Sequence, residues 1–111
     1  MTRMEQLKQF LKEQPNDPFM QYCIALEYIK TGDKEEGLLW FDKLQTGHPD
    51  YVATYYHKGK LLEALNKKEL AEQTYSTGIE VAQRIQDYHA LSELQGARNE
   101  LVNDFDVEFD D

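Results

Sequence analysis

The side chains that could carry chemistry are few and widely separated along the chain. The three histidines are His48, His57 and His89, and no two of them have the i, i+4 spacing of a helical metal site. Cys23 is the single cysteine, so neither a zinc site built on thiolates nor an intrachain disulfide is supported. The sequence therefore predicts no bound metal and no cofactor.

No catalytic constellation emerges from the remaining residues. Carboxylates are plentiful, but adjacent pairs such as Glu35-Glu36 are typical of solvated charge runs. Gly32 and Gly47 are isolated helix ends and do not form a phosphate-binding loop, and no Gly-x-Ser-x-Gly motif is present. We predict that the protein is not an enzyme.

The charge balance argues against nucleic acid as a partner. The chain has 12 basic and 21 acidic residues, for a net charge of −9, and phosphate backbones would repel it. Lysines do lie among aromatic residues at Tyr55, Tyr56, Lys58 and Lys60, but neighbouring acids dilute them. Five acids and no base occupy residues 103–111, which we expect to form an acidic, disordered tail behind a helical domain at 1–102.

Nothing in the sequence points to a membrane. The first ten residues, MTRMEQLKQF, lack the apolar core of a signal peptide, and no apolar run is long enough to span a bilayer. The expectation is a single-domain, cytoplasmic protein that has no membrane partner.

Helix signals alternate with breaks along most of the chain. Thr2, Asp17 and Asp33 are candidate N-caps, and Pro18 suits a first helical position. Gly32 and Asn66 suit the left-handed conformation that ends helices. Six helices are predicted, at about 2–14, 18–31, 34–47, 50–66, 68–86 and 88–102, the fifth longer than its counterparts.

Many features recur after 34 residues, and a fixed period of this size indicates a repeat array. The recurring pairs are Pro15 and Pro49, Ala25 and Gly59, Tyr28 and Leu62, Gly37 and Ala71, and Phe41 and Tyr75.

This pattern resembles the tetratricopeptide repeat family, which places small residues at Ala25, Gly59, Gly37 and Ala71 and aromatic residues at Phe41 and Tyr75. One repeat covers 18–51, a second starts at Val52, and residues 2–17 supply a second-helix half. Beyond Gln86 the residues no longer follow the repeat pattern. The resemblance implies an all-α, right-handed stack of antiparallel helix hairpins, with adjacent helices in contact through Ala25 and Gly59.

The resemblance also implies a concave face that is lined by the first helix of each repeat. We call the residues implied there the predicted strip. They form an aromatic and aliphatic surface with lysines at its edge, which suits an extended or helical peptide with apolar anchors and a few acids. The predicted strip comprises Phe19, Tyr22, Leu26, Ile29 and Lys30 from the first repeat, and Tyr56, Lys60 and Glu63, beside Ala53 and Ala64, from the second.

The family's clamp for a C-terminal carboxylate is absent, because Tyr22, Leu26 and His57 stand where lysine and asparagine belong. Two functions remain open. One is a non-catalytic interaction module or scaffold that binds a protein or peptide in the groove. The other is a self-associating subunit, such as a homodimer, in which flanking helices cover the predicted strip. Phe105 and Phe109 of the tail could dock beside Lys30 and Lys60, or the tail could be solubilising only.

Overall fold

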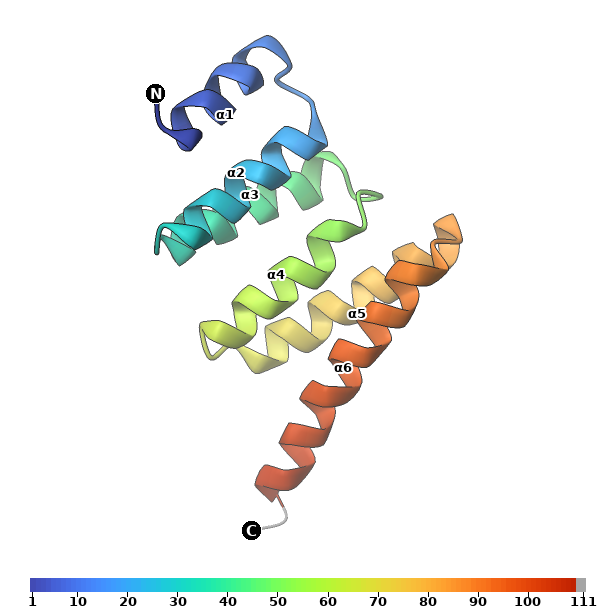
Figure 1. Ribbon diagram of the computed structural model, residues 1–111. Coiled ribbons are helices and arrows are strands. Elements are labelled where there is room, and N and C mark those ends of the chain that lie inside the picture. Colours follow the sequence, from blue (N-terminus) through green and yellow to red (C-terminus); the bar gives the residue numbers. More distant parts are fainter. Residues whose placement is uncertain (110–111) are drawn as a thin grey trace. The chain divides into compact units, whose positions relative to one another are not determined.

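Six helices make up the part of the chain that the structure describes, as the sequence predicts. The computed structural model describes the backbone of residues 1–109 and the side chains of residues 1–103, and that part of the chain contains no strand (Figure 1). The prediction of an all-α fold is confirmed. The helices are α1 (Arg3–Glu13), α2 (Pro18–Lys30), α3 (Lys34–Gly47), α4 (Ala53–Ala64), α5 (Lys68–Ile85) and α6 (Tyr88–Phe109).

The helices fall into two compact units. The first unit runs from Met1 to Tyr51 and contains α1, α2 and α3. The second begins at Val52 and contains α4, α5 and α6. Each unit therefore holds one whole hairpin and one additional helix, α1 in the first and α6 in the second.

Side-chain caps set the helix starts of the first unit where the sequence predicts them. The Asp17 carboxylate accepts hydrogen bonds from the backbone N–H groups of Phe19, at 2.9 Å, and Met20, at 3.4 Å, and Pro18 takes the first helical position. Gly32, with φ at 94°, follows α2, and the Asp33 carboxylate then caps α3.

Small residues allow α2 and α3 to pack closely. A Cβ on Gly37 would lie 2.8 Å from Cγ1 of Ile29 and 3.2 Å from the carbonyl oxygen of Ala25, so a larger side chain has no room there. Ala25 and Phe41 are fully buried. Helix α1 also packs against α2, and Nε of Arg3 lies 3.7 Å from a Glu27 carboxylate oxygen.

In the second unit, α5 packs against both α4 and α6 (Figure 1). Gly59 of α4 faces the buried ring of Tyr75, and Gly78 of α5 faces Tyr55 on α4 and Leu94 on α6. Ala25 and Gly59 were predicted as contact points of adjacent helices. Within its own unit, each lies against the second helix of its repeat.

Two helix boundaries differ from the sequence prediction by more than two residues. Helix α4 begins at Ala53 rather than Asp50, and no side chain caps it. In the first repeat Asp17 caps α2, but the equivalent position 34 residues later holds Tyr51, which is not one of the residue types that cap helices. Helix α6 continues to Phe109 rather than ending at Val102, since no glycine or proline follows Val102 to stop it. Residue 102, taken as the end of the helical domain, thus lies within α6, and residues 110 and 111 lie outside the described part.

Helix α5 has 18 residues against 14 in α3, which confirms the predicted extension. It ends at Gln86, which adopts the left-handed conformation with φ at 61°. The Asp87 carboxylate then accepts a hydrogen bond from the backbone N–H of Ala90, at 3.0 Å, and starts α6.

Candidate partner-binding site

Aromatic side chains of the first unit gather at the start of α2. Phe19 is 52% exposed, and its ring centroid lies 6.3 Å from that of the half-buried Tyr22. Tyr22 in turn lies 5.8 Å from Tyr51. Burial raises the pKa of both tyrosine hydroxyls above the usual value, so both stay neutral at physiological pH. These three rings form a partly exposed platform, which we call the aromatic cluster.

Tyr51 is a member of the aromatic cluster that the sequence analysis missed. The sequence placed it in the fourth helix, predicted at about 50–66. In the structure Tyr51 lies in the turn after α3, where its backbone N–H donates to the His48 carbonyl at 3.0 Å. A shallow hollow of about 380 Å³ lies beside it, lined by Pro18, His48, Tyr51 and their neighbours Gly47, Pro49 and Asp50.

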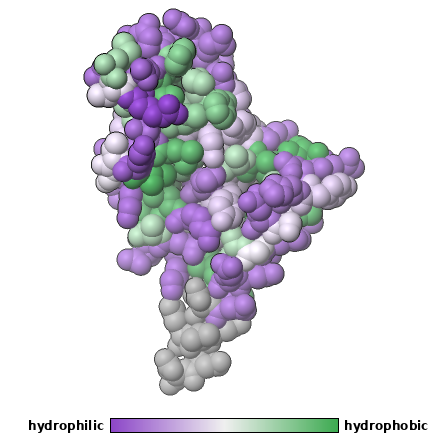
Figure 2. Space-filling model, in the orientation of Figure 1, coloured by the Kyte–Doolittle hydropathy of each residue, from purple (hydrophilic) through white to green (hydrophobic). Residues whose placement is uncertain are grey.

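The other residues of α2 in the predicted strip differ in burial and in contacts. Leu26 is half-buried, and Lys30 is exposed at the last position of the helix. Ile29 is also half-buried, but it lies against Gly37 of α3. Figure 2 shows hydrophobic surface over the region of α1 and α2. Phe10 of α1 and Phe19 of α2 are each more than half exposed.

In the second unit, the predicted residues of α4 form a linked row. The ammonium group of Lys60 lies 5.7 Å from the Tyr56 ring centroid and 3.9 Å from a Glu63 carboxylate oxygen. Glu63 also accepts a hydrogen bond from the Tyr75 hydroxyl of α5. Burial, with this hydrogen bond as a second cause, raises the pKa of Tyr75 strongly, so its hydroxyl stays a donor. The row is therefore fixed to the core of its unit through Glu63.

Helices α4 and α6 enclose a hollow of about 190 Å³. We call it the His57–Glu93 hollow. The Tyr56 and His57 rings stand nearly perpendicular, with centroids 5.4 Å apart. Burial lowers the pKa of His57, and the negative charge of Glu93 partly opposes this effect. The lining residues are Val52, Ala53, Tyr56, His57, Ala90, Glu93 and Leu94.

The sequence did not predict that His57 and Glu93 belong to a common site. From the sequence, His57 was considered only as a metal ligand and as an occupant of the family's carboxylate-clamp position. The available signal was the i, i+3, i+4 spacing of Ala90, Glu93 and Leu94, which places the carboxylate beside two apolar residues on one side of α6. The sequence did not show which helix packs against this side of α6.

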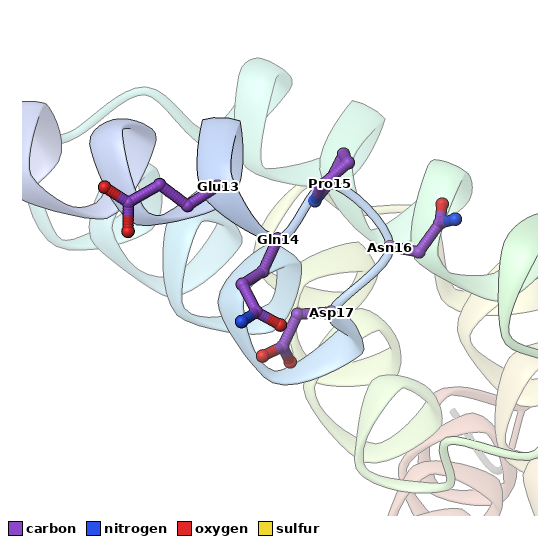
Figure 3. A pocket seen from close by; sticks show the side chains of 5 residues that line it. All are labelled: Glu13, Gln14, Pro15, Asn16 and Asp17. Carbon is purple, nitrogen blue, oxygen red and sulfur yellow. The ribbon is translucent and has the colours of Figure 1, made fainter.

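The turn between α1 and α2 surrounds another hollow, of about 440 Å³, lined by the consecutive residues Glu13, Gln14, Pro15, Asn16 and Asp17 (Figure 3). Several of these groups already serve the local backbone. Asp17 caps α2, and the Pro15 carbonyl accepts a hydrogen bond from Nε2 of the buried Gln21 at 3.2 Å. This hollow follows from the shape of the turn.

Among the residues that the structure describes, no three His, Cys, Asp or Glu side chains are grouped so that they could hold a metal ion. None of the described helices combines the length and hydrophobicity that crossing a membrane requires. Burial raises the pKa of the half-buried Cys23 thiol, which keeps it protonated and poorly nucleophilic.

Comparison with solved structures identifies the family. The chain matches no protein-family model and no curated protein. It is 44% identical to a tetratricopeptide repeat domain protein from Salinibacter ruber solved in solution, with a TM-score of 0.76, covering 78% of this chain and 88% of that one. A crystal structure of a tetratricopeptide repeat domain protein from the same organism gives 44% identity and a TM-score of 0.73 over 77% and 96% of the two chains.

A protein from Bordetella parapertussis shares the fold more widely. Its solution structure gives a TM-score of 0.84 over 98% of this chain and 95% of that one, at 19% identity. The repeat spacing, the small residues at the helix crossings and the identity to the Salinibacter ruber domain lead to one conclusion. The chain belongs to the tetratricopeptide repeat family.

Proposed function

We propose that this protein is a non-catalytic scaffold that binds a peptide or a partner helix along the first helices of its repeats, α2 and α4. The family's fold generally serves protein interaction. The observation that carries the proposal is that each of these helices has a half-buried tyrosine on its surface, Tyr22 in the aromatic cluster and Tyr56 beside Lys60.

Tyrosines held in this way are suited to anchor a partner. A ring that neighbouring side chains already hold loses little conformational entropy on binding, and aromatic residues are enriched among binding hot spots. Tyr22 is flanked by Phe19 and Tyr51, and Tyr56 by His57 and Lys60. Lys30 and Lys60 can meet acids of the partner, but exposed ion pairs contribute only about 0–1 kcal/mol. The aromatic contacts therefore provide most of the binding free energy.

The net charge of −9 disfavours nucleic acid as the partner, and we propose a cytoplasmic setting.

A second candidate function is self-association, which is favoured by one observation. Phe10 of α1 and Leu44 of α3 occupy equivalent positions of the 34-residue repeat. Phe10 is 55% exposed, whereas Leu44 is fully buried. Another copy of the chain could cover this exposed ring. The mass in solution, with and without Phe10→Ala, distinguishes this candidate from a monomeric scaffold.

A random peptide library displayed on phage tests the proposal. Peptides selected on the wild-type protein should be lost by the Tyr22→Ala, Tyr56→Ala double variant and kept by Tyr88→Ala, a matched change of a tyrosine that is 65% exposed on α6. Circular dichroism checks that all three proteins are folded. Equal retention of the peptides by the folded double variant would exclude Tyr22 and Tyr56 as anchors.

A further inference from the structure

We propose that the His57–Glu93 hollow is a subsite for one aromatic side chain that carries or adjoins a positive charge. This inference rests on the proposed function, because it specifies which residue of a bound peptide the second unit selects. The shape of the hollow, the rings at its rim and the charge of Glu93 carry it.

The size and floor of the hollow suit a single ring. A cavity of about 150 Å³ with apolar walls is large enough to bind benzene, and this hollow measures about 190 Å³. Val52, Ala53, Ala90 and Leu94 supply apolar lining from both helices. Two of the four are alanines, whose short side chains leave the space open, while the buried Leu94 closes the inner side.

The rim offers two aromatic partners in different orientations. The Tyr56 and His57 rings meet at an interplanar angle of 80°, so a ring entering the hollow can stack on one and meet the edge of the other. An aliphatic side chain would gain the apolar contacts but not these ring contacts. The geometry therefore favours an aromatic occupant.

The charge at the rim favours a cation beside that ring. Glu93 belongs to the lining and is half exposed, so a ligand can reach its carboxylate. Its present contact is with His89, 3.4 Å from Nε2 to the carboxylate oxygen, and this contact is an ion pair only when the imidazole is protonated. His57 is held neutral by burial, and Lys60, on the same helix, lies near Glu63 and the Tyr56 ring. A ligand ammonium or guanidinium can pair with Glu93, whereas a carboxylate would be repelled.

Two small probes with the same ring and opposite charges test the subsite. Phenethylammonium and 3-phenylpropionate are each titrated into the ¹⁵N-labelled protein at pH 7.5. We expect phenethylammonium to shift the amide signals of Tyr56, His57, Ala90 and Glu93, and 3-phenylpropionate to bind on the order of two- to fivefold more weakly, in the range of a partly exposed ion pair.

Variants separate the ring contact from the charge contact. Ala90→Leu fills the hollow and should abolish the response to both probes. Glu93→Gln should keep the ring contact and remove the preference for the cation. Glu69→Gln, which changes an exposed acid on α5, should leave both titrations as in the wild type.

The proposal is overturned if phenethylammonium shifts none of these signals at saturating concentration, if both probes bind equally, or if Ala90→Leu responds as the wild type does. These results are distinguishable from failure of the proposed function. If the selected peptides depend on Tyr22 and Tyr56 but neither probe binds in the hollow, the subsite alone is refuted. Probe binding at the hollow, with equal peptide retention by the double variant, would refute the proposed function alone.

Discussion

Gly59 of α4 lies directly against the ring of Tyr75 of α5. A Cβ added to Gly59 would sit 2.6 Å from Cζ and 2.7 Å from Cδ1 of that ring, closer than carbon atoms can approach. In the first unit the corresponding close approach uses Gly37 of the second helix, against Ile29 and Ala25. The first hairpin thus has its close-packed glycine on the second helix, whereas the second hairpin has such glycines on both helices, Gly59 on α4 and Gly78 on α5.

Gly59→Ala should destabilise the protein although alanine is the better helix former. The methyl group forces the buried Tyr75 ring to move, and overpacking of this kind costs about 1–3 kcal/mol, against a gain of about 1 kcal/mol from helix propensity. Urea denaturation measures the difference. The control is Gly96→Ala on α6, where a Cβ would meet nothing within 4 Å, and it should stabilise the protein by about 0.5–1 kcal/mol. A Gly59→Ala protein as stable as Gly96→Ala would contradict the close contact.

Loss of the Tyr75 hydroxyl should weaken the second unit. Tyr75→Phe removes the hydrogen bond to the Glu63 carboxylate, and bonds to charged groups contribute about 1.5–3 kcal/mol. The loss should fall at the lower end, because Glu63 keeps access to water. The free energy of unfolding in urea provides the measurement, and Tyr88→Phe, at an exposed tyrosine, is the matched control.

The same tyrosine predicts a loss of stability in alkali. Its folded pKa lies above the unfolded value of about 10, so its contribution is complete below pH 10 and is lost as the pH rises toward the folded pKa, because only the unfolded chain ionises there. The free energy of unfolding should fall more steeply above pH 10 in the wild type than in Tyr75→Phe. Parallel curves for the two proteins would show that Tyr75 is not the group responsible.

His57 predicts the opposite pH dependence. Its folded pKa is below the unfolded value of about 6.5, chiefly through burial, so the unfolded state binds the proton more readily. The contribution of His57 is present above pH 6.5 and is lost as the pH falls through the folded pKa. Between pH 7.5 and 5.5, His57→Gln should lose less stability than the wild type. A His57→Gln protein with the same pH dependence as the wild type would show that His57 is not the group responsible.

Gln86→Gly should stabilise the turn between α5 and α6. Gln86 ends α5 with φ at 61°, a conformation that costs a side-chain-bearing residue roughly 1–2 kcal/mol and glycine almost nothing. Part of that gain is offset by the greater freedom of glycine in the unfolded chain, so an increase of about 0.5–1 kcal/mol is expected. Thermal unfolding measures it. Asn66→Gly, with φ at 60°, should gain less because asparagine tolerates this conformation.

The sequence by itself determined the helices and their repeat, because the signals are local. The signals at Asp17, Pro18 and Asp33 act on backbone groups within three residues. Gly32 adopts the positive φ that the end of α2 requires. The 34-residue recurrence, together with the small residues at the crossings, then predicted the fold class. The weak points were boundaries without such signals. The start of α4 has no capping side chain, and the end of α6 has no breaker.

Only the tertiary structure decided which side chains of the candidate site meet. The resemblance pointed to Tyr22 and Tyr56, but the contact of Tyr51 with Tyr22 depends on the path of the turn after α3. The enclosure of His57 with Glu93 depends on how α6 packs on α4. Helical periodicity shows which residues share a face but not which helix covers that face. The sequence therefore predicted which helices carry the site, and packing between residues distant in the chain gave the site its shape and charge.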